Sequence, residues 1–234
     1  LIETVTREET ERKKEYYEAT KHESWMRDMT LEEFLGDTRG MPRWGEPESE
    51  STIQQLKELS PNPFPAALID FYKTRGFVYG GEMLCAFHIF APSLLVERHN
   101  ATEKYRHLES MGIADFIRHI WDNDRPEVGI GSEYYTDEQI RYLNTNYTAV
   151  GIFQRPEDGE ESHDYIYFDK DGNFGIFYLH QDEMDMRPLL GKSPANKTWE
   201  EVLSDVIGKL DNNYRAAKEE EEQWKQSQSA ADNE

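Results

Sequence analysis

The sequence predicts a mixed fold in which helices and β-strands share one core. Residues 164–179, DYIYFDKDGNFGIFYL, carry alternating apolar side chains on both sides of an Asp-Gly turn signal, which is typical of a β-hairpin. Residues 147–153, YTAVGIF, predict a further strand. Residues 199–210 place large apolar side chains at helical spacing, after a capping-box start at Thr198 and Glu201. Because both faces of the hairpin carry apolar side chains, one face must be covered by another element.

Residues 1–51 are predicted to form a helical N-terminal extension. Thr6 and Thr30 each begin the spacing of a capping box, which predicts a charged helix to about residue 24 and a short helix ending at Gly36. Residues 37–51, rich in Gly and Pro, are expected to be a linker or a surface loop. The large apolar side chains of the extension are expected to pack onto the main body, because two such helices alone would be marginally stable. These side chains are Tyr16, Tyr17, Trp25, Met26, Met29, Phe34 and Leu35.

The main body is predicted to span residues 52–214. It begins with one helical stripe, and a second helix follows Pro65 and stops at Gly76, because proline suits the first turn of a helix and glycine its end. Residues 83–90 are typical of a largely buried strand. The remaining pattern predicts helices after Pro92 and over residues 112–120 and 136–143, and a short strand over residues 128–130. Residues 215–234 are predicted to be a charged tail that frays or extends the last helix.

Acidic residues outnumber basic ones and are concentrated in one segment. The chain has 47 acidic and 26 basic residues, a formal net charge of −21. Residues 122–185 hold 16 acidic and 4 basic residues, whereas residues 51–121 hold 7 of each. This balance argues against direct binding to nucleic acid or to an anionic membrane, because phosphate contacts need Lys and Arg. Solubility alone would explain an acidic composition, but a concentrated negative field favours docking on a basic partner.

The sequence predicts a cytoplasmic protein. Its single cysteine, Cys85, sits in an apolar run and has no partner within the chain for a disulfide bond. The first residues lack the apolar stretch of a secretory signal. No segment approaches the roughly 18 to 20 apolar residues that a membrane-spanning helix needs.

No segment matches an established catalytic or cofactor motif. Residues 169–173, DKDGN, invite an EF-hand interpretation, but the spacing puts Tyr167 and Tyr178 at ligand positions, so a hairpin turn with solvated carboxylates is favoured. His163 and His180 flank the hairpin beside several carboxylates, where a metal site or an acid–base pair is imaginable. We therefore expect no metal, no cofactor and no enzymatic activity, with a carboxylate-based hydrolase as the weaker alternative.

Three segments resemble an SMI1/KNR4-type (SUKH) domain over roughly residues 52–214. The first is FPAALIDFYKTRGFVYGGEMLCAFHIFAPSLL, in which a Pro-led helix ending near glycines leads to a strand and a Pro-Ser turn. The strand YTAVGIFQ with the hairpin, and the helix TWEEVLSDVIGKL, follow in the order that such domains use. The chain departs from the family in its N-terminal extension and in a longer insertion between residues 96 and 145.

The resemblance implies an α+β fold with a mainly antiparallel sheet packed against helices. It also implies a non-catalytic role, either as an immunity protein that neutralises a cognate toxin or, alternatively, as a regulatory scaffold. We expect a basic toxin, such as a nuclease, whose cleft is blocked by acidic side chains, with tyrosines adding contact area. The predicted contacts are Glu133, Tyr134, Tyr135, Glu157, Asp158, Glu160, Glu161 and Asp164.

Overall fold

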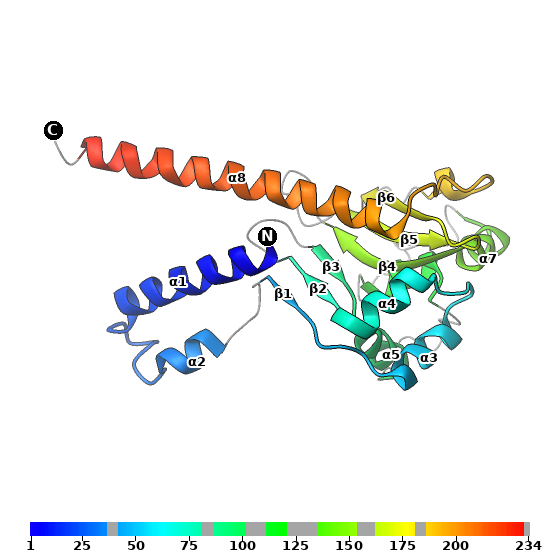
Figure 1. Ribbon diagram of the computed structural model, residues 1–234, viewed down its shortest axis with the longest axis horizontal. Coiled ribbons are helices and arrows are strands. Elements are labelled where there is room, and N and C mark those ends of the chain that lie inside the picture. Colours follow the sequence, from blue (N-terminus) through cyan, green and yellow to red (C-terminus); the bar gives the residue numbers. More distant parts are fainter. Residues whose placement is uncertain are drawn as a thin grey trace.

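The protein has an α+β fold, seen in a computed structural model, with one antiparallel sheet and helices on both of its faces (Figure 1). The structure describes residues 1–36, 42–80, 87–101, 111–120, 135–153, 162–180 and 186–231. The predicted fold class is confirmed. The short strand predicted over residues 128–130 lies outside the described residues.

The six strands of the sheet lie side by side in the order in which they occur in the chain, each antiparallel to the next. They are β1 (Arg43–Trp44), β2 (Val78–Tyr79), β3 (Phe87–Ile89), β4 (Tyr147–Phe153), β5 (Ser162–Asp169) and β6 (Phe174–His180). β3 lies within the strand predicted over residues 83–90, of which residues 83–86 are outside the described part. β1 falls in the segment expected to be a linker, so part of the N-terminal extension belongs to the sheet.

The predicted hairpin is confirmed as β5 and β6. Phe168 pairs with Phe174, and the pairing continues without a shift to Ser162 and His180. Gly172 in the turn has a φ of 81°, a conformation that glycine adopts without strain. Every residue from 163 to 169 is buried, so both faces of β5 are covered.

Eight α-helices and one 3₁₀-helix, η3, are present in the described part of the chain. They are α1 (Ile2–Thr20), α2 (Leu31–Gly36), α3 (Glu50–Leu59), α4 (Ala66–Arg75), α5 (Pro92–Ala101), α6 (Ile113–Ile120), α7 (Asp137–Asn146), α8 (Trp199–Ala231) and η3 (Arg187–Leu189). The capping boxes predicted at Thr30 and Thr198 are both formed. Thr136 also caps α7 as predicted, and its capping box is completed by Gln139.

Helices α4 and α8 cover one face of the hairpin. The Trp199 ring at the start of α8 lies 5.4 Å from Phe71 of α4 and 5.2 Å from Phe174 of β6, measured between ring centroids. Phe64, just before α4, packs edge-on against Phe168 of β5 at 5.2 Å. These rings form one apolar layer beneath the sheet.

The opposite face of the hairpin packs against α6 and η3. Phe116 of α6 contacts Tyr165 of β5 edge-on, with 6.3 Å between ring centroids. Tyr147 of β4 donates a buried 2.8 Å hydrogen bond from its hydroxyl to the Leu189 carbonyl in η3. The hairpin therefore lies between two helical layers, and this burial fixes its position.

Helix α1 starts four residues before the predicted start at Thr6. Ile2 and Val5 are buried, and Ile2 belongs to the main core, so their burial draws the first turn onto the body. Thr6 lies inside the helix, where its hydroxyl donates to the carbonyls of Ile2 and Pro42 rather than capping an end. Tertiary burial thus overrides the local capping signal.

The last helix runs far beyond the predicted main body. α8 continues to Ala231 and projects past the sheet, with α1 beside it and α2 beyond α1 (Figure 1). Tyr214 and Lys218 of α8 both contact Glu8 of α1. We call α1, α2 and residues 211–231 of α8 the arm. The two terminal segments are therefore joined in one structural unit.

Candidate partner-binding surface

Three strand ends meet at one end of the hairpin. Phe153, the last residue of β4, lies in register with the start of β5, and Ser162 at that start pairs with His180 at the end of β6. The segments 154–161 and 181–185 are therefore both attached to this end of the sheet. We call these two segments, with the strand ends that anchor them, the acidic end.

Seven carboxylates belong to the two segments of the acidic end. They are Glu157, Asp158, Glu160, Glu161, Asp182, Glu183 and Asp185. With Arg155 included, the two segments carry a net charge of −6. Each carboxylate lies within four residues of a described residue, so the covalent chain alone holds its backbone within about 14 Å of that anchor. The register therefore tethers the predicted negative charge to one end of the sheet.

Six of the eight predicted contacts lie outside the described residues, and their role stays a prediction. They are Glu133, Tyr134, Glu157, Asp158, Glu160 and Glu161. The other two, Tyr135 and Asp164, are 3% and 6% exposed. Neither side chain is available to a partner, which corrects this part of the prediction.

Asp164 is buried because α8 crosses the sheet at this point. Its Oδ2 atom lies 4.0 Å from the Lys209 ammonium nitrogen of α8. The same ammonium lies 5.3 Å from the centre of the Phe153 ring, a cation–π arrangement. Asp164 therefore joins α8 to the acidic end of the sheet rather than facing solvent. Sequence reasoning missed this contact, because Lys209 lies 45 positions after Asp164 in the chain.

Tyr135 is buried because it holds the chain that follows β6. Its hydroxyl accepts a hydrogen bond from the Met186 backbone N–H, and the Met186 side chain is fully buried. This bond fixes Met186, the first described residue after segment 181–185, to the chain just before α7. Tyr135 thus has a structural role inside the protein, because it holds Met186, the residue that follows segment 181–185 of the acidic end.

The turn at the other end of the hairpin is ordered by hydrogen bonds to the Asp169 carboxylate. Asp169 is 2% exposed, and its Oδ1 atom accepts hydrogen bonds of 3.0 Å from the N–H groups of Asp171 and Asn173. Its Oδ2 atom accepts a 2.7 Å bond from the Ser193 hydroxyl. The expectation of solvated turn carboxylates holds for Asp171, which is exposed, but not for Asp169, whose oxygens order the turn.

The register separates the two histidines that flank the hairpin. His163 pairs with Leu179, whereas His180 pairs with Ser162, so the two histidines occupy positions of opposite parity. His163 is 8% exposed, and burial lowers its pKa to about 4. An acid–base pair of His163 with His180 is therefore not supported by the sheet.

The α1 and α8 parts of the arm are held together by a three-residue contact. Glu8 of α1 is bonded to Lys218 at 2.7 Å and accepts a hydrogen bond from the Tyr214 hydroxyl. The bonds from Lys218 and Tyr214 lower the pKa of the Glu8 carboxyl. Because the charged form of Glu8 is favoured in the folded protein, this contact is strongest above the ordinary Glu pKa and is lost as the pH falls through the lowered value.

We expect a double-mutant cycle on Glu8→Gln and Lys218→Met to give a coupling energy of about 0.5 to 1 kcal/mol, as for a partly exposed ion pair. The coupling is measured from urea unfolding at pH 7 in low salt, and it should shrink at 0.5 M NaCl. The pair Glu11 and Lys14, which is formed within α1 alone, is the matched control. Additive effects of the two substitutions would mean that α1 and α8 are not coupled through Glu8.

The outer part of the arm does not show the predicted packing of its large apolar side chains against the main body. Met26 is buried, but Tyr16, Trp25 and Met29 are exposed and do not pack onto the main body as predicted. The body instead receives Ile2 from α1. The sequence signal that could have shown this is the wide gap between Val5 and Tyr16, over which α1 has no large apolar side chain.

Neither a cluster of metal-ligating side chains nor a membrane-spanning helix is found in the described part of the chain. There, no three His, Cys, Asp or Glu side chains gather in a way that could hold a metal ion. The helices of the same described residues include none with the length and apolar character to cross a membrane. Comparisons with known protein families, with curated proteins and with solved structures found no match.

Proposed function

We propose that the protein is a non-catalytic immunity protein that binds a basic toxin in the cytoplasm and blocks the toxin's active-site cleft with its acidic end. The observation that carries the proposal is the strand register, which attaches the two acidic segments to the same end of the sheet. A negative charge of −6 on two short tethered segments provides attraction over a distance comparable to the Debye length, about 8 Å in physiological salt.

The residues that anchor the two acidic segments are held in place by the rest of the fold, which favours this role. β5 is buried on both faces, and Lys209 and Tyr135 brace the residues that anchor the two segments. A rigid base limits the entropy that is lost when charged segments dock on a partner. The antiparallel α+β architecture is also the one that the resemblance to SMI1/KNR4-type domains implies.

A regulatory scaffold is the second candidate, and the arm is the observation that favours it. The two terminal segments contain none of the predicted toxin contacts. They contact each other and form a helical unit that projects from the body (Figure 1). Deleting residues 1–51 would not test the scaffold cleanly, because Ile2 and β1 belong to the core and to the sheet. Point substitutions on the arm are therefore the better test.

The toxin-binding proposal predicts that neutralising the acidic end weakens the complex with the product of the adjacent gene. The variant carries Glu157→Gln, Asp158→Asn, Glu160→Gln and Glu161→Gln. Its dissociation constant, measured by calorimetry in 50 mM salt, should rise at least about tenfold, because four charges leave one docking surface. The wild-type affinity should fall steeply between 50 and 300 mM salt.

A control variant with the same change in net charge separates local docking from overall charge. It neutralises four exposed carboxylates on α3, α4, α7 and α8, and it should bind within about threefold of wild type. The substitutions are Glu58→Gln, Asp70→Asn, Glu138→Gln and Glu200→Gln. The proposal would be overturned if both variants lost the same affinity for the toxin or if the wild-type affinity did not depend on salt. It would also be overturned if no complex formed with the adjacent gene's product.

A further inference from the structure

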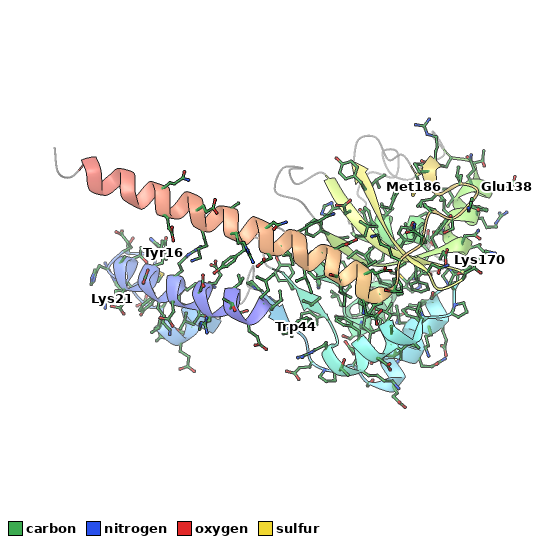
Figure 2. All side chains as sticks on the ribbon, turned by 45° about the horizontal axis from the view of Figure 1, so that its top comes forward. Tyr16, Lys21, Trp44, Glu138, Lys170 and Met186 are labelled. Atoms are coloured by element: carbon green, nitrogen blue, oxygen red, sulfur yellow. The ribbon has the colours of Figure 1, made fainter. Side chains whose placement is uncertain are left out.

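The tip of the arm exposes large apolar side chains. Trp25 is 59% exposed, Tyr16 is 52% exposed and Met29 is 39% exposed, whereas Met26 between them is 1% exposed. Tyr16 lies on the arm well away from the sheet, at the opposite end of the molecule from Glu138 (Figure 2). Trp, Tyr and Met are enriched at the centres of protein interfaces, and an exposed group of them is uncommon on a monomer. We call residues 15–34 the tip.

The tip is ordered by contacts of its own. The Phe34 ring of α2 stacks on Tyr16 at 6.2 Å and contacts Tyr17 at 5.7 Å, measured between ring centroids. The Lys13 ammonium lies 5.7 Å from the centre of the Phe34 ring. The Tyr17 hydroxyl donates a 2.9 Å hydrogen bond to the Met29 carbonyl, which closes the turn between the two helices. The exposed side chains are therefore presented on a preorganised support, which lowers the entropy cost of docking.

The charge around these side chains selects the partner. Residues 15–33 contain six acidic and two basic residues, a net charge of −4. Glu15, Glu18, Glu23 and Asp28 are all exposed. Exposed carboxylates in the same segment as exposed apolar side chains are complementary to an amphipathic segment with Lys or Arg beside its apolar face. A second copy is disfavoured, because two tips of the same sign and two chains of −21 repel each other.

We infer that the tip is a second docking surface, separate from the acidic end, and that it binds a basic amphipathic segment of a protein partner. Trp25 and Met29 supply the apolar contact, and the exposed carboxylates of the tip supply the attraction. The contact is direct and non-covalent, so it needs neither a metal nor a cofactor. This surface would give the scaffold role a specific binding site, and it does not depend on the toxin-blocking role of the acidic end.

The test uses the full chain and a fluorescein-labelled 18-residue amphipathic helix made of Leu and Lys. Fluorescence anisotropy should show saturable 1:1 binding, and Trp25→Ala with Met29→Ala should weaken it at least about tenfold. A Leu and Glu peptide of the same pattern should not bind. Because both substituted side chains are exposed, the circular dichroism spectrum and the melting temperature should stay as in wild type.

Tyr178→Ala is the matched control, because Tyr178 is 43% exposed and lies on β6 beside the acidic end. It should change the peptide affinity by less than about twofold. Loss of binding in Tyr178→Ala but not in the tip variant would place the peptide at the acidic end and overturn the inference. Absence of saturable binding, equal affinity of the tip variant, or equal binding of the acidic peptide would also overturn it. The toxin-blocking role of the acidic end is tested separately, by the variant that neutralises residues 157–161.

Discussion

Replacing Gly76 with alanine is expected to lower the free energy of unfolding by about 3 to 4 kcal/mol. Gly76 ends α4 with φ 66° and ψ −62°, the geometry of a classical γ-turn, and the Phe77 N–H bonds to the Arg75 carbonyl at 2.7 Å. This conformation is strained for any residue with a Cβ atom. A Cβ at this position would also lie 1.8 Å from the Glu46 carbonyl oxygen, which is backbone and cannot rotate away.

Gly208→Ala is the matched control for Gly76→Ala. Gly208 is exposed inside α8, more than two turns from either end, and a Cβ atom there would meet nothing within 4 Å. Alanine should therefore stabilise the protein by about 0.5 to 1 kcal/mol through helix propensity. Urea unfolding followed by circular dichroism measures both variants. A Gly76→Ala protein as stable as wild type would show that the chain does not adopt the γ-turn.

The second large effect is a loss of stability in mild acid that depends on His163. Burial lowers the pKa of this histidine from 6.5 to about 4, so the neutral ring is favoured in the folded protein. Well above pH 6.5 the histidine is neutral in both the folded and the unfolded state, and it has no effect on how stability changes with pH. Between pH 6.5 and pH 4 only the unfolded state takes up the proton, so stability falls as the pH falls. At pH 5 this histidine is expected to lower the free energy of unfolding by about 2 kcal/mol.

The variant His163→Phe isolates this contribution, because phenylalanine keeps a buried ring and does not titrate. The unfolding free energy is measured in urea at pH 7 and at pH 5 for both proteins. Wild type should lose about 2 kcal/mol more than the variant over this interval. The acidic residues contribute equally to both proteins and cancel in the comparison. If the two proteins lose the same stability, His163 is solvated or paired in its charged form.

Local patterns were sufficient for most elements of the fold. The Asp-Gly signal placed the turn between β5 and β6, and Thr30 and Thr198 begin the helices that their capping boxes predicted. Pro65 and Gly76 mark the two ends of α4. These signals succeed because each depends on the conformation of a few neighbouring residues, which the sequence specifies directly.

Exposure was harder to predict than secondary structure. Asp164 was expected to face a partner and Trp25 to face the core, and the structure reverses both. Lys209 of α8 lies beside Asp164. Ile2, and not the side chains of the tip, packs in the main core. Such contacts join residues that are far apart in the chain. The apolar alternation and the composition around one residue therefore do not predict them.

The sequence by itself determined the mixed fold, the hairpin with its turn, the helix caps and the excess of negative charge in residues 122–185. Only the tertiary structure decided that the two acidic segments are attached at one end of the sheet, and that the two termini join in an arm with an exposed aromatic tip. The physical reason is that backbone preferences act over a few residues, whereas strand register and helix packing depend on which distant apolar faces bury each other.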